Sequence, residues 1–403
     1  MALIQSMQET ENLCSSSRAR PAPLAPQRIW VLLSNRVGDN AQVLALAAAL
    51  KIPYETRIFS NRRGAIAANL LLGSWLPYLV RGRAACLTPP WPDLVIAAGS
   101  QSEPICAQIR DHAASNGHQV KFVFLGRPWK SLAMYELIVT TPQYRVPAAG
   151  NVMQIELPLH LVTRDKVARL AEIWSARMSH LPRPYIMVSL GGSINRYTLD
   201  CYAAKRLARQ ANALAGGGSL LVCSSFRTPK RIISTLKQYV SRPSYMFDWE
   251  QSATENPYLA FLGLADRIVV TGDSITMLAE ACETGKPVYI FDLGEGLFSM
   301  KEPHVSPAAR EVDWLWLMST LRASYKDAEV KLIRKLLPKR LQRDTRVVHQ
   351  RLIKHGSAAW LGEGQFAQDV SSSLDSTLDV ANRVLSILSD RKPGASWGHS
   401  HAI

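Results

Sequence analysis

The sequence predicts an α/β protein with two domains, each built on a parallel β-sheet covered by helices. Short apolar runs rich in β-branched residues, such as 29–34, 93–99, 185–192 and 267–271, alternate with helical patterns. Strands this apolar are buried on both faces, which is typical of parallel sheets. The alternation stops near residue 181 and then begins again. A chain of 403 residues is long enough for two such domains.

Composition indicates a globular protein with an anionic partner. The hydrophobic fraction is 47%, and the net charge is +15 with a sequence pI near 9.7. A nucleic acid, an anionic membrane surface and a phosphorylated substrate all fit this charge, but we expect no nucleic acid because no zinc-finger, RRM or homeodomain pattern is present. The six cysteines form no CxxC pair and are expected to be reduced core residues. No apolar run is long enough to predict a membrane-spanning helix.

The first domain is predicted to cover residues 28–160, after a disordered tail at 1–27 that lacks the pattern of a signal peptide. A loop is expected at 35–40, directly after the first strand. The predicted strands are 29–34, 54–59, 93–99, 121–126 and 136–141, and the predicted helices are 41–50 and 104–115.

Two basic segments leave alternatives open. Residues 65–80 form an apolar run flanked by arginine pairs, which fits either a helix at an anionic membrane surface or a core helix interrupted by Pro77. Residues 322–354 contain eleven Lys or Arg and three Asp or Glu. That stretch fits either membrane docking or a solvated helix face.

The second domain is predicted at 185–360, after a helical connector at 161–184. A C-terminal helix and tail, 361–403, are expected to follow, with the helical part at 371–389 able to fold back across the domains. The predicted strands are 185–192, 218–225, 244–249, 267–271 and 287–291, with helices between them, one of them at 255–265.

Residues 267–293 predict a strand, a tight turn, one amphipathic helix and a second strand. Asp273 or Ser274 is expected to cap that helix, and Gly285 to end it. Thr276 and Glu280 fall on the face opposite the apolar one, so Glu280 is expected to be exposed. A helix N-terminus with a carboxylate beside it suits a phosphate and a ribose hydroxyl. An ordinary capped βαβ unit explains the same pattern.

Several other predicted strands of the second domain also end in small polar residues. Glycines allow close approach of the backbone to an anion, and hydroxyl and N–H groups donate to phosphate oxygens. The guanidinium of Arg227 matches phosphate geometry. Neither half contains GxGxxG or a P-loop, and each loop alone is compatible with a plain turn. The loops carry Gly191, Gly192 and Ser193; Ser224, Ser225, Arg227 and Thr228; Trp249 and Glu250; and Gly272, Asp273 and Ser274.

Six motifs occur in order along the chain: GDNAQ (38–42), GSQS (99–102), SLGG (189–192), SSFRTP (224–229), ENPY (255–258) and VTGDSITMLAEACETGKPVYIF (270–291). In this combination the chain resembles the plant "elongated mitochondria" family of mitochondrial fission proteins and its bacterial homologues. The resemblance covers roughly residues 28–300 and weakens beyond them. The plant proteins are associated with mitochondrial division, a role that does not transfer directly to bacterial members.

The resemblance implies the GT-B architecture, in which two Rossmann-like domains face a cleft, here with a C-terminal helical segment. The family is also similar to the cytoplasmic transferases that glycosylate lipid-linked acceptors. By that resemblance Glu280 binds the ribose. The residues expected at the nucleotide sugar are Gly191, Gly192, Ser193, Ser225, Arg227, Thr228, Gly272, Ser274, Ile275, Thr276 and Glu280.

The first domain is expected to hold the acceptor and the catalytic base. Asp39 is the leading candidate because an inverting transfer needs a group that deprotonates the acceptor hydroxyl. A cap of the helix that starts at Ala41 explains Asp39 equally well. Glu103 and His160 are weaker candidates, and His304 is expected to be solvated. The acceptor-side set is Gly38, Asn40, Gln42, Ser100 and Gln101.

The predicted function is transfer of a sugar from a nucleotide-diphosphate sugar to a membrane-associated acceptor that is lipid-linked or part of the envelope. We expect no cofactor, and no metal because no DxD-like acidic pair lies in a suitable loop. The expected location is cytoplasmic, with the protein peripheral on the inner face of the membrane. A non-catalytic binding or scaffold protein of the same fold is the first alternative, and a nucleotide-sugar epimerase is the second.

Overall fold

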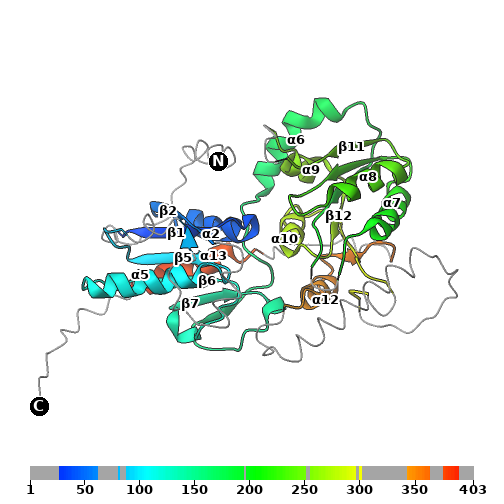
Figure 1. Ribbon diagram of the computed structural model, residues 1–403. Coiled ribbons are helices and arrows are strands. Elements are labelled where there is room, and N and C mark those ends of the chain that lie inside the picture. The colour runs from blue at the N-terminus through cyan, green and yellow to red at the C-terminus, as the bar shows by residue number, and fades with distance from the viewer. Residues whose placement is uncertain are drawn as a thin grey trace, which may run out of the picture. The chain divides into compact units, whose positions relative to one another are not determined.

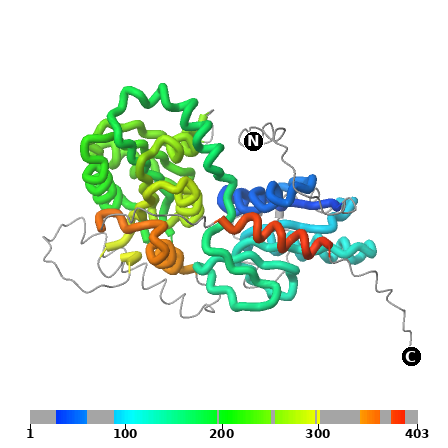
Figure 2. Tube along the Cα trace, turned by 180° about the vertical axis from the view of Figure 1, so that it is seen from behind, coloured from blue at the N-terminus to red at the C-terminus, as the bar shows by residue number. Residues whose placement is uncertain are grey.

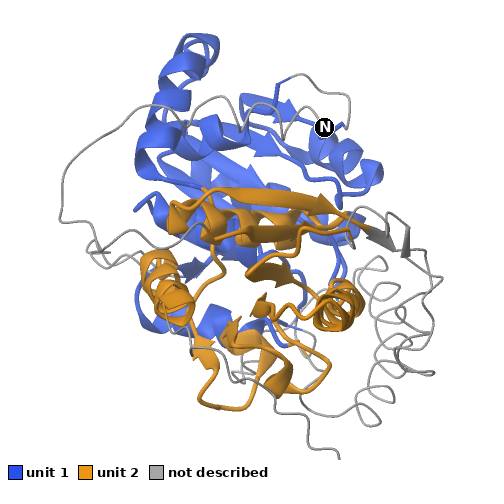
Figure 3. Ribbon diagram, turned by 90° about the vertical axis from the view of Figure 1, so that its left-hand side faces the viewer, with its two compact units in different colours: residues 1–25, 162–339, 344–374 blue, residues 26–161, 340–343, 375–403 orange. Residues whose placement is uncertain are grey.

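The computed structural model describes residues 27–61, 80–81, 88–194, 197–250, 255–295, 299–301, 343–363 and 375–389. The chain divides into two compact units (Figure 3). Unit 1 comprises residues 162–339 and 344–374 together with 1–25, and unit 2 comprises 26–161, 340–343 and 375–403.

Unit 2 contains a six-stranded parallel sheet in the order β2-β1-β5-β6-β7-β8. Strands that follow one another within this sheet are paired, except that β1 pairs with β5 on the side away from β2. The strands are β1 (Ile29–Leu33), β2 (Tyr54–Ile58), β5 (Leu94–Ala98), β6 (Lys121–Leu125), β7 (Leu137–Thr140) and β8 (Val152–Gln154). A separate antiparallel pair joins β3 (Ser60–Asn61) to β4 (Val80–Arg81).

Helices cover both faces of this sheet. One face packs on α2 (Val37–Leu50) and α13 (Thr377–Ser389), which lie side by side (Figure 2). The other face packs on α5 (Glu103–Ser115), with Trp30 and Phe124 at the centre. Two short 3-10 helices complete the unit, η3 (Leu132–Met134) and η4 (Pro142–Tyr144).

The predicted loop at 35–40 is wrong. Helix α2 begins at Val37, so Asp39 lies inside its first turn and Arg36 occupies the N-cap position. The interpretation of Asp39 as a side-chain cap is therefore wrong too. A carboxylate in the first turn interacts favourably with the helix dipole, which helps to explain the earlier start.

Unit 1 contains the second six-stranded parallel sheet, of which Figure 1 labels β11 and β12. Its strand order is β11-β10-β9-β12-β13-β14. Numbered along the unit, this is 3-2-1-4-5-6, the order of the Rossmann fold. The strands are β9 (Tyr185–Ser189), β10 (Ser219–Cys223), β11 (Ser244–Phe247), β12 (Arg267–Thr271), β13 (Val288–Phe291) and β14 (Ala359–Trp360).

The helices of unit 1 pack mainly through small and aliphatic residues. Helix α7 turns a stripe of alanines and Leu207 toward β9 and β10, and α6 packs on α9 through Trp174 and Phe261. Asp200 caps α7 by accepting from the Ala203 N–H at 2.9 Å. The helices are α6 (Arg164–Met178), α7 (Cys201–Ala215), α8 (Lys230–Tyr239), α9 (Tyr258–Leu264), α10 (Ile275–Glu283) and α12 (Arg346–Lys354).

The predicted fold class is confirmed in its two Rossmann-like parallel-sheet units, its repeated strand–helix order and its C-terminal helical segment. Strands β8 and β14 were not predicted, because three and two residues are too few for a periodic pattern. Helix α12, from the basic stretch 322–354, buries Val348, His349 and Leu352. Residues 62–79 and 302–342 lie outside the described residues, and with them most of the 65–80 segment, His304 and the first part of that basic stretch.

Candidate functional site

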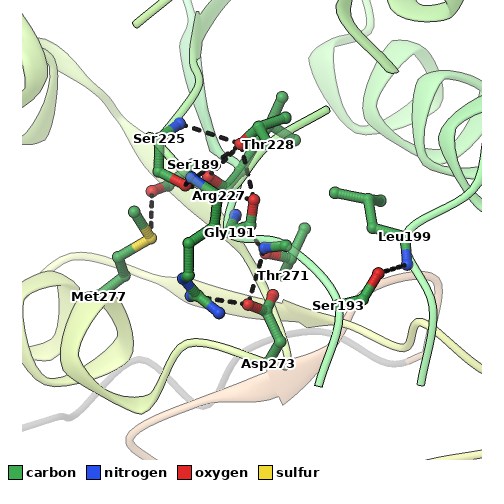
Figure 4. A network of polar contacts seen from close by, with 12 residues as sticks. Ser189, Gly191, Ser193, Leu199, Ser225, Arg227, Thr228, Thr271, Asp273 and Met277 are labelled. Carbon is green, nitrogen blue, oxygen red and sulfur yellow. Dashed lines mark hydrogen bonds and ion pairs between the residues drawn. The ribbon is translucent and has the colours of Figure 1, made fainter. Parts of the chain in front are cut away.

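The candidate site of unit 1 lies where the strand order reverses. Strands β9 and β12 are neighbours at the centre of the sheet, and their following connections run to opposite sides. In open α/β sheets, ligands bind at the carboxyl end of the strands at such a switch point. The loops after β9, β10 and β12 meet there, and Figure 4 shows the polar contacts that join them.

Both glycine N–H groups after β9 already donate within the protein. Gly191 donates to Thr271 Oγ1 at 2.8 Å, and Gly192 donates to Asp273 Oδ2 at 2.8 Å. A Cβ added to Gly191 would lie 2.3 Å from that carboxylate oxygen, so no larger residue fits without displacement. The two glycines therefore serve close packing of loop on loop.

Arg227, the predicted diphosphate cation, is paired with Asp273. Its Nη2 atom lies 2.8 Å from Asp273 Oδ2 (Figure 4). The Asp273 side chain is completely buried, whereas that of Arg227 is 34% exposed. Burial raises the pKa of Asp273, although the Arg227 cation and the Gly192 N–H oppose that effect. Its other oxygen, Oδ1, has no hydrogen-bond partner among the described residues.

Hydroxyl groups from the β10 loop hold the loop after β9. Thr228 Oγ1 donates to the Gly191 carbonyl at 2.6 Å, and Ser225 Oγ lies 3.2 Å from the same oxygen. Ser193 Oγ accepts from the Leu199 N–H at 3.0 Å. The structure thus brings together the predicted residues of these two loops, but it engages their hydroxyls in loop–loop contacts.

Helix α10 starts at Ile275 with Ser274 at the N-cap position, and no side-chain cap bond is made. The predicted position is therefore right for Ser274, but the side-chain cap is wrong for both residues, because the Asp273 carboxylate turns to Gly192 and Arg227 instead. Gly272 is also tightly packed, since an added Cβ would lie 2.9 Å from Met300 Sδ and 3.2 Å from His349 Cε1.

Glu280 is half-buried, and the expectation that it is exposed is wrong. Its Oε2 atom accepts a hydrogen bond from the Tyr258 hydroxyl at 2.6 Å. Burial raises the pKa of Glu280 to about 7, although the Tyr258 hydrogen bond acts in the other direction. A carboxylate with a raised pKa is a frequent feature of functional sites.

Sequence reasoning missed the roles of Asp273 and Tyr258. Asp273 is predicted only as a helix cap and as a member of a strand-end loop, yet its carboxylate links the loops after β9, β10 and β12. The signal available was an acid directly after a buried strand at the switch point. Tyr258 lies in the ENPY motif that carried the family resemblance, but nothing in that motif names Glu280 as its partner.

The candidate site of unit 2 lies at the corresponding place in its own sheet, between β1 and β5. A Cβ added to Gly99 would lie 2.3 Å from Oδ2 of Asp39, so the loop after β5 packs directly on this carboxylate. Burial raises the pKa of Asp39, while the Arg36 and Arg343 cations act to lower it. Asp39 is the predicted base, and an elevated pKa suits proton abstraction near neutral pH.

The neighbours of Asp39 in the GDNAQ motif hold the local backbone. Asn40 accepts from the Ser34 N–H at 2.9 Å and donates to the Ser34 carbonyl at 2.8 Å. Gln42 donates to the Gly38 carbonyl at 3.3 Å. These contacts fix the start of α2 and leave Asp39 as the ionisable group of the motif.

The remaining candidates of unit 2 divide between loop and core. Ser100 and Gln101 lie half-buried in the turn between β5 and α5. Glu103 is buried and accepts from the N–H groups of Trp129 and Lys130 at 2.8 and 2.9 Å, so its role is to anchor that loop. His160 is also buried.

Residues 37–304 match the sequence profile of the mitochondrial fission ELM1 family. The chain belongs to this family. The ELM1 protein of Arabidopsis thaliana is 27% identical over 222 residues, which are 49% of this chain and 51% of that protein. The chain therefore spans about half the length of this relative. An uncharacterised protein of Rickettsia prowazekii is 23% identical over 300 residues, covering 65% of this chain and 82% of that one.

Solved structures also resemble this ELM1-family chain at low identity. A glycosyltransferase from Rickettsia africae is 11% identical with a TM-score of 0.45, covering 89% of this chain and 98% of that one. An ADP-heptose heptosyltransferase II of Escherichia coli is 14% identical with a TM-score of 0.40, covering 66% and 84%. A UDP-GlcNAc 2-epimerase of Methanocaldococcus jannaschii is 11% identical with a TM-score of 0.40, covering 65% and 83%.

The ELM1-family match begins after β1 and ends before α12, β14 and α13. It contains Asp39 and the whole switch point of unit 1, whereas β1 and the last three elements lie beyond it. In the described part of the chain, no His, Cys, Asp and Glu side chains gather in a group of three or more that could hold a metal ion. Nor does any described helix have both the length and the apolar character needed to cross a bilayer.

Proposed function

We propose that this ELM1-family protein binds a nucleotide-diphosphate sugar on unit 1 and transfers the sugar to an acceptor held by unit 2. The observation that carries the proposal is the convergence of three strand-end loops at the switch point of a 3-2-1-4-5-6 sheet. Such a place offers a guanidinium and the free N–H groups of a helix N-terminus to a diphosphate.

In the proposed complex, the diphosphate binds at the N-terminus of α10 beside Ser274 and Thr276. Arg227 exchanges its Asp273 partner for phosphate oxygens, which bind a guanidinium in the same forked geometry. Glu280 accepts from a ribose hydroxyl as its carboxylate. Because the pKa of Glu280 is about 7, nucleotide affinity is expected to rise as the pH rises through that value.

The proposed reaction needs one base and no covalent intermediate. The acceptor oxygen bonds to the anomeric carbon while the bond from that carbon to the diphosphate oxygen breaks, and the nucleoside diphosphate leaves. The proton of the acceptor hydroxyl passes to Asp39. Arg227 and the α10 dipole stabilise the charge that develops on the leaving diphosphate.

The test is binding of UDP-, GDP-, CMP- and ADP-linked sugars to the full chain, followed by thermal unfolding. A nucleotide at about 100 times its dissociation constant adds about 2.7 kcal/mol to the free energy of unfolding. Glu280→Ala is expected to abolish that gain while the unliganded protein stays folded. Unchanged melting with every nucleotide would contradict the proposal.

A second candidate is a non-catalytic binding protein, and the pairing of Arg227 with Asp273 favours it. A guanidinium that is already neutralised by a buried carboxylate attracts a diphosphate less strongly. The name of the Arabidopsis relative, a mitochondrial fission protein, points the same way. The two candidates separate in turnover, because a binding protein holds the donor without releasing its sugar to an acceptor.

A further inference from the structure

Unit 2 carries two arginines at the carboxyl edge of its sheet that the proposed reaction does not use. We propose that Arg127 and Arg343 form a binding site for a phosphate group, and that the acceptor held by unit 2 carries this phosphate. Only the identification of the bound molecule as the acceptor rests on the proposed function. The phosphate site itself is argued from unit 2 alone.

The two guanidinium groups converge on one aromatic ring. Arg127 follows β6 after Gly126, and Tyr144 lies in η4 directly after β7. The guanidinium carbons of Arg127 and Arg343 each lie 5.7 Å from the centroid of the Tyr144 ring. Arg343 Nε also donates to Gln143 Oε1 at 2.8 Å. Two segments more than two hundred residues apart in the sequence therefore present like charges to the same place.

Arg127 has donor groups that the described protein does not satisfy. Its Nε and Nη1 atoms are buried and have no hydrogen-bond partner among the described residues. Burial lowers the pKa of Arg127, and the nearby Arg343 cation lowers it further. Buried polar donors in native proteins are nearly always bonded, so an unsatisfied guanidinium calls for an anionic partner.

The surrounding carboxylates do not fill that role. Glu103 affects Arg127 electrostatically, but both of its oxygens accept from backbone N–H groups of Trp129 and Lys130. Asp39 interacts electrostatically with the Arg36 and Arg343 cations rather than with Arg127. In the described part of unit 2, no carboxylate forms an ion pair with Arg127.

A phosphate fits better than a carboxylate ligand. A phosphate monoester carries about −1.5 to −2 charges near neutral pH and offers three acceptor oxygens, which matches two guanidinium groups. The planar guanidinium of Arg127 can donate parallel hydrogen bonds to such a group, and Arg343 adds a second positive charge beside it. Because Arg343 also acts on Asp39, a phosphate bound here brings the rest of the ligand close to the proposed base.

The first test is calorimetric titration of the full chain with inorganic phosphate. Arg127→Gln and Arg343→Gln are each expected to weaken phosphate binding about tenfold or more, since each removes charged hydrogen-bond donors. The matched control is Arg57→Gln, because Arg57 also stacks on an aromatic ring, Trp30, at 4.3 Å but already pairs with Glu55. The control is expected to bind phosphate as the wild type does.

Titration of the same proteins with UDP separates this inference from the proposed function. If phosphate binding depends on Arg127 and Arg343 while no nucleotide binds, the phosphate site stands and the donor site fails. Equal phosphate affinity in wild type, Arg127→Gln and Arg343→Gln would overturn the phosphate site. Should Arg127→Gln fail to fold, Arg127→Lys and Arg343→Gln give the same comparison, because Lys keeps the charge and loses the fork.

A second titration distinguishes a soluble phosphate from a lipid headgroup. Glycerol 1-phosphate serves as the soluble probe, and phosphatidylcholine vesicles with and without phosphatidic acid serve as the lipid probe. Binding of either probe that Arg127→Gln and Arg343→Gln both abolish supports the site and identifies its source. Binding that neither variant weakens contradicts it.

Discussion

Arg227 Nη2 lies 2.8 Å from Oδ2 of Asp273, so the cation predicted for a diphosphate is paired with a buried carboxylate. The same oxygen accepts from the Gly192 N–H, and this one side chain therefore joins the loops after β9, β10 and β12. The two partners differ in burial, since the Asp273 side chain is 0% exposed and that of Arg227 is 34% exposed. Removing one partner is therefore not equivalent to removing the other.

The unequal burial predicts opposite effects of two substitutions on stability. Arg227→Gln leaves a buried carboxylate without its cation and is expected to lower the free energy of unfolding by about 2 to 4 kcal/mol. Asp273→Asn removes a charge whose pKa is raised by burial, keeps an acceptor for Gly192, and leaves a guanidinium that reaches solvent. That variant is expected to be at least as stable as the wild type and to bind diphosphate more tightly. Denaturant unfolding and UDP titration measure both effects.

The pair formed by Arg183 and Asp266 is a matched control. Asp266 also accepts from a backbone N–H, that of Tyr185 at 2.7 Å, and lies 2.9 Å from Arg183, but both side chains are well exposed. Arg183→Gln is expected to cost about 0 to 1 kcal/mol. Equal costs for Arg183→Gln and Arg227→Gln would contradict the importance of burial.

The pattern of the sequence predicted ten of the twelve strands in the two six-stranded sheets, all but β8 and β14, but not the contacts at the sheet edges. Apolar runs such as 267–271 predict buried parallel strands because burial on both faces leaves little choice of residue. The Asp273–Arg227 pair joins residues 46 apart, and the Tyr258–Glu280 bond joins residues 22 apart. No local period records such pairs, since tertiary packing decides them.

Tertiary contacts also explain the start of α2 and the place of α13. Helix α2 starts four residues before the predicted start, and the Asn40 contacts with Ser34 fix the turn that leads into it. This start was not predicted because Val37 and Gly38 have no strong helical pattern. Helix α13 belongs to unit 2 although residues 344–374 belong to unit 1. Its buried face packs on α2, and its amphipathic pattern cannot specify that partner.

Gly191 is expected to tolerate no side chain. In Gly191→Ala the new Cβ would lie 2.3 Å from Asp273 Oδ2, so the carboxylate must move away from Gly192 and Arg227. Overpacking of this kind is expected to cost about 1 to 3 kcal/mol in unfolding free energy. Gly217→Ala is the control, because no atom lies within 4 Å of its added Cβ. Comparable losses in the two variants would contradict the packing argument.

Glu280 is expected to make stability fall as the pH rises. Its pKa is about 7 in the folded protein against an ordinary value of 4.5, so the folded state binds the extra proton between those values. Stability attributable to this group is therefore greatest below about pH 4.5 and is lost as the pH passes about 7. Glu280→Gln is expected to remove this decline, which amounts to about 1 to 3 kcal/mol. Denaturant unfolding at several pH values measures it.

Tyr258→Phe tests the cause of the Glu280 effect. The Tyr258 hydroxyl donates to the ionised carboxylate and so lowers the pKa of Glu280. Loss of that hydroxyl is expected to raise the pKa of Glu280 further and to start the decline in stability at the same pH but end it at a higher one. An unchanged pH profile in Tyr258→Phe would show that the bond has no effect on the titration.

The buried Asp39 carboxylate is expected to lower the free energy of unfolding. Burial raises its pKa, which means that the folded protein disfavours the charged form at neutral pH. Asp39→Asn is therefore expected to raise the free energy of unfolding by about 0.5 to 2 kcal/mol, which is the usual gain when a destabilising functional residue is replaced. The same variant is expected to bind the donor normally and to lose turnover. Wild-type turnover would remove Asp39 as the base.

His349 is expected to make the protein sensitive to acid. Burial lowers the pKa of His349 to about 4 from 6.5, although the Gly272 backbone and the Asp344 carboxylate act to raise it. The folded state thus binds fewer protons than the unfolded state between these values. Stability due to the neutral ring is present above about pH 6.5 and falls as the pH drops toward about 4.

His349→Met is expected to remove this loss of stability at low pH, here called the acid limb, because a thioether fills the space beside Gly272 and Trp360 without titrating. At about pH 5 the variant is expected to exceed the wild type in unfolding free energy by about 1 to 2 kcal/mol. His355→Met is the control, because His355 is exposed at the end of the same helix and its removal leaves the acid limb in place. Identical acid limbs in wild type and His349→Met would mean that another buried group sets the sensitivity.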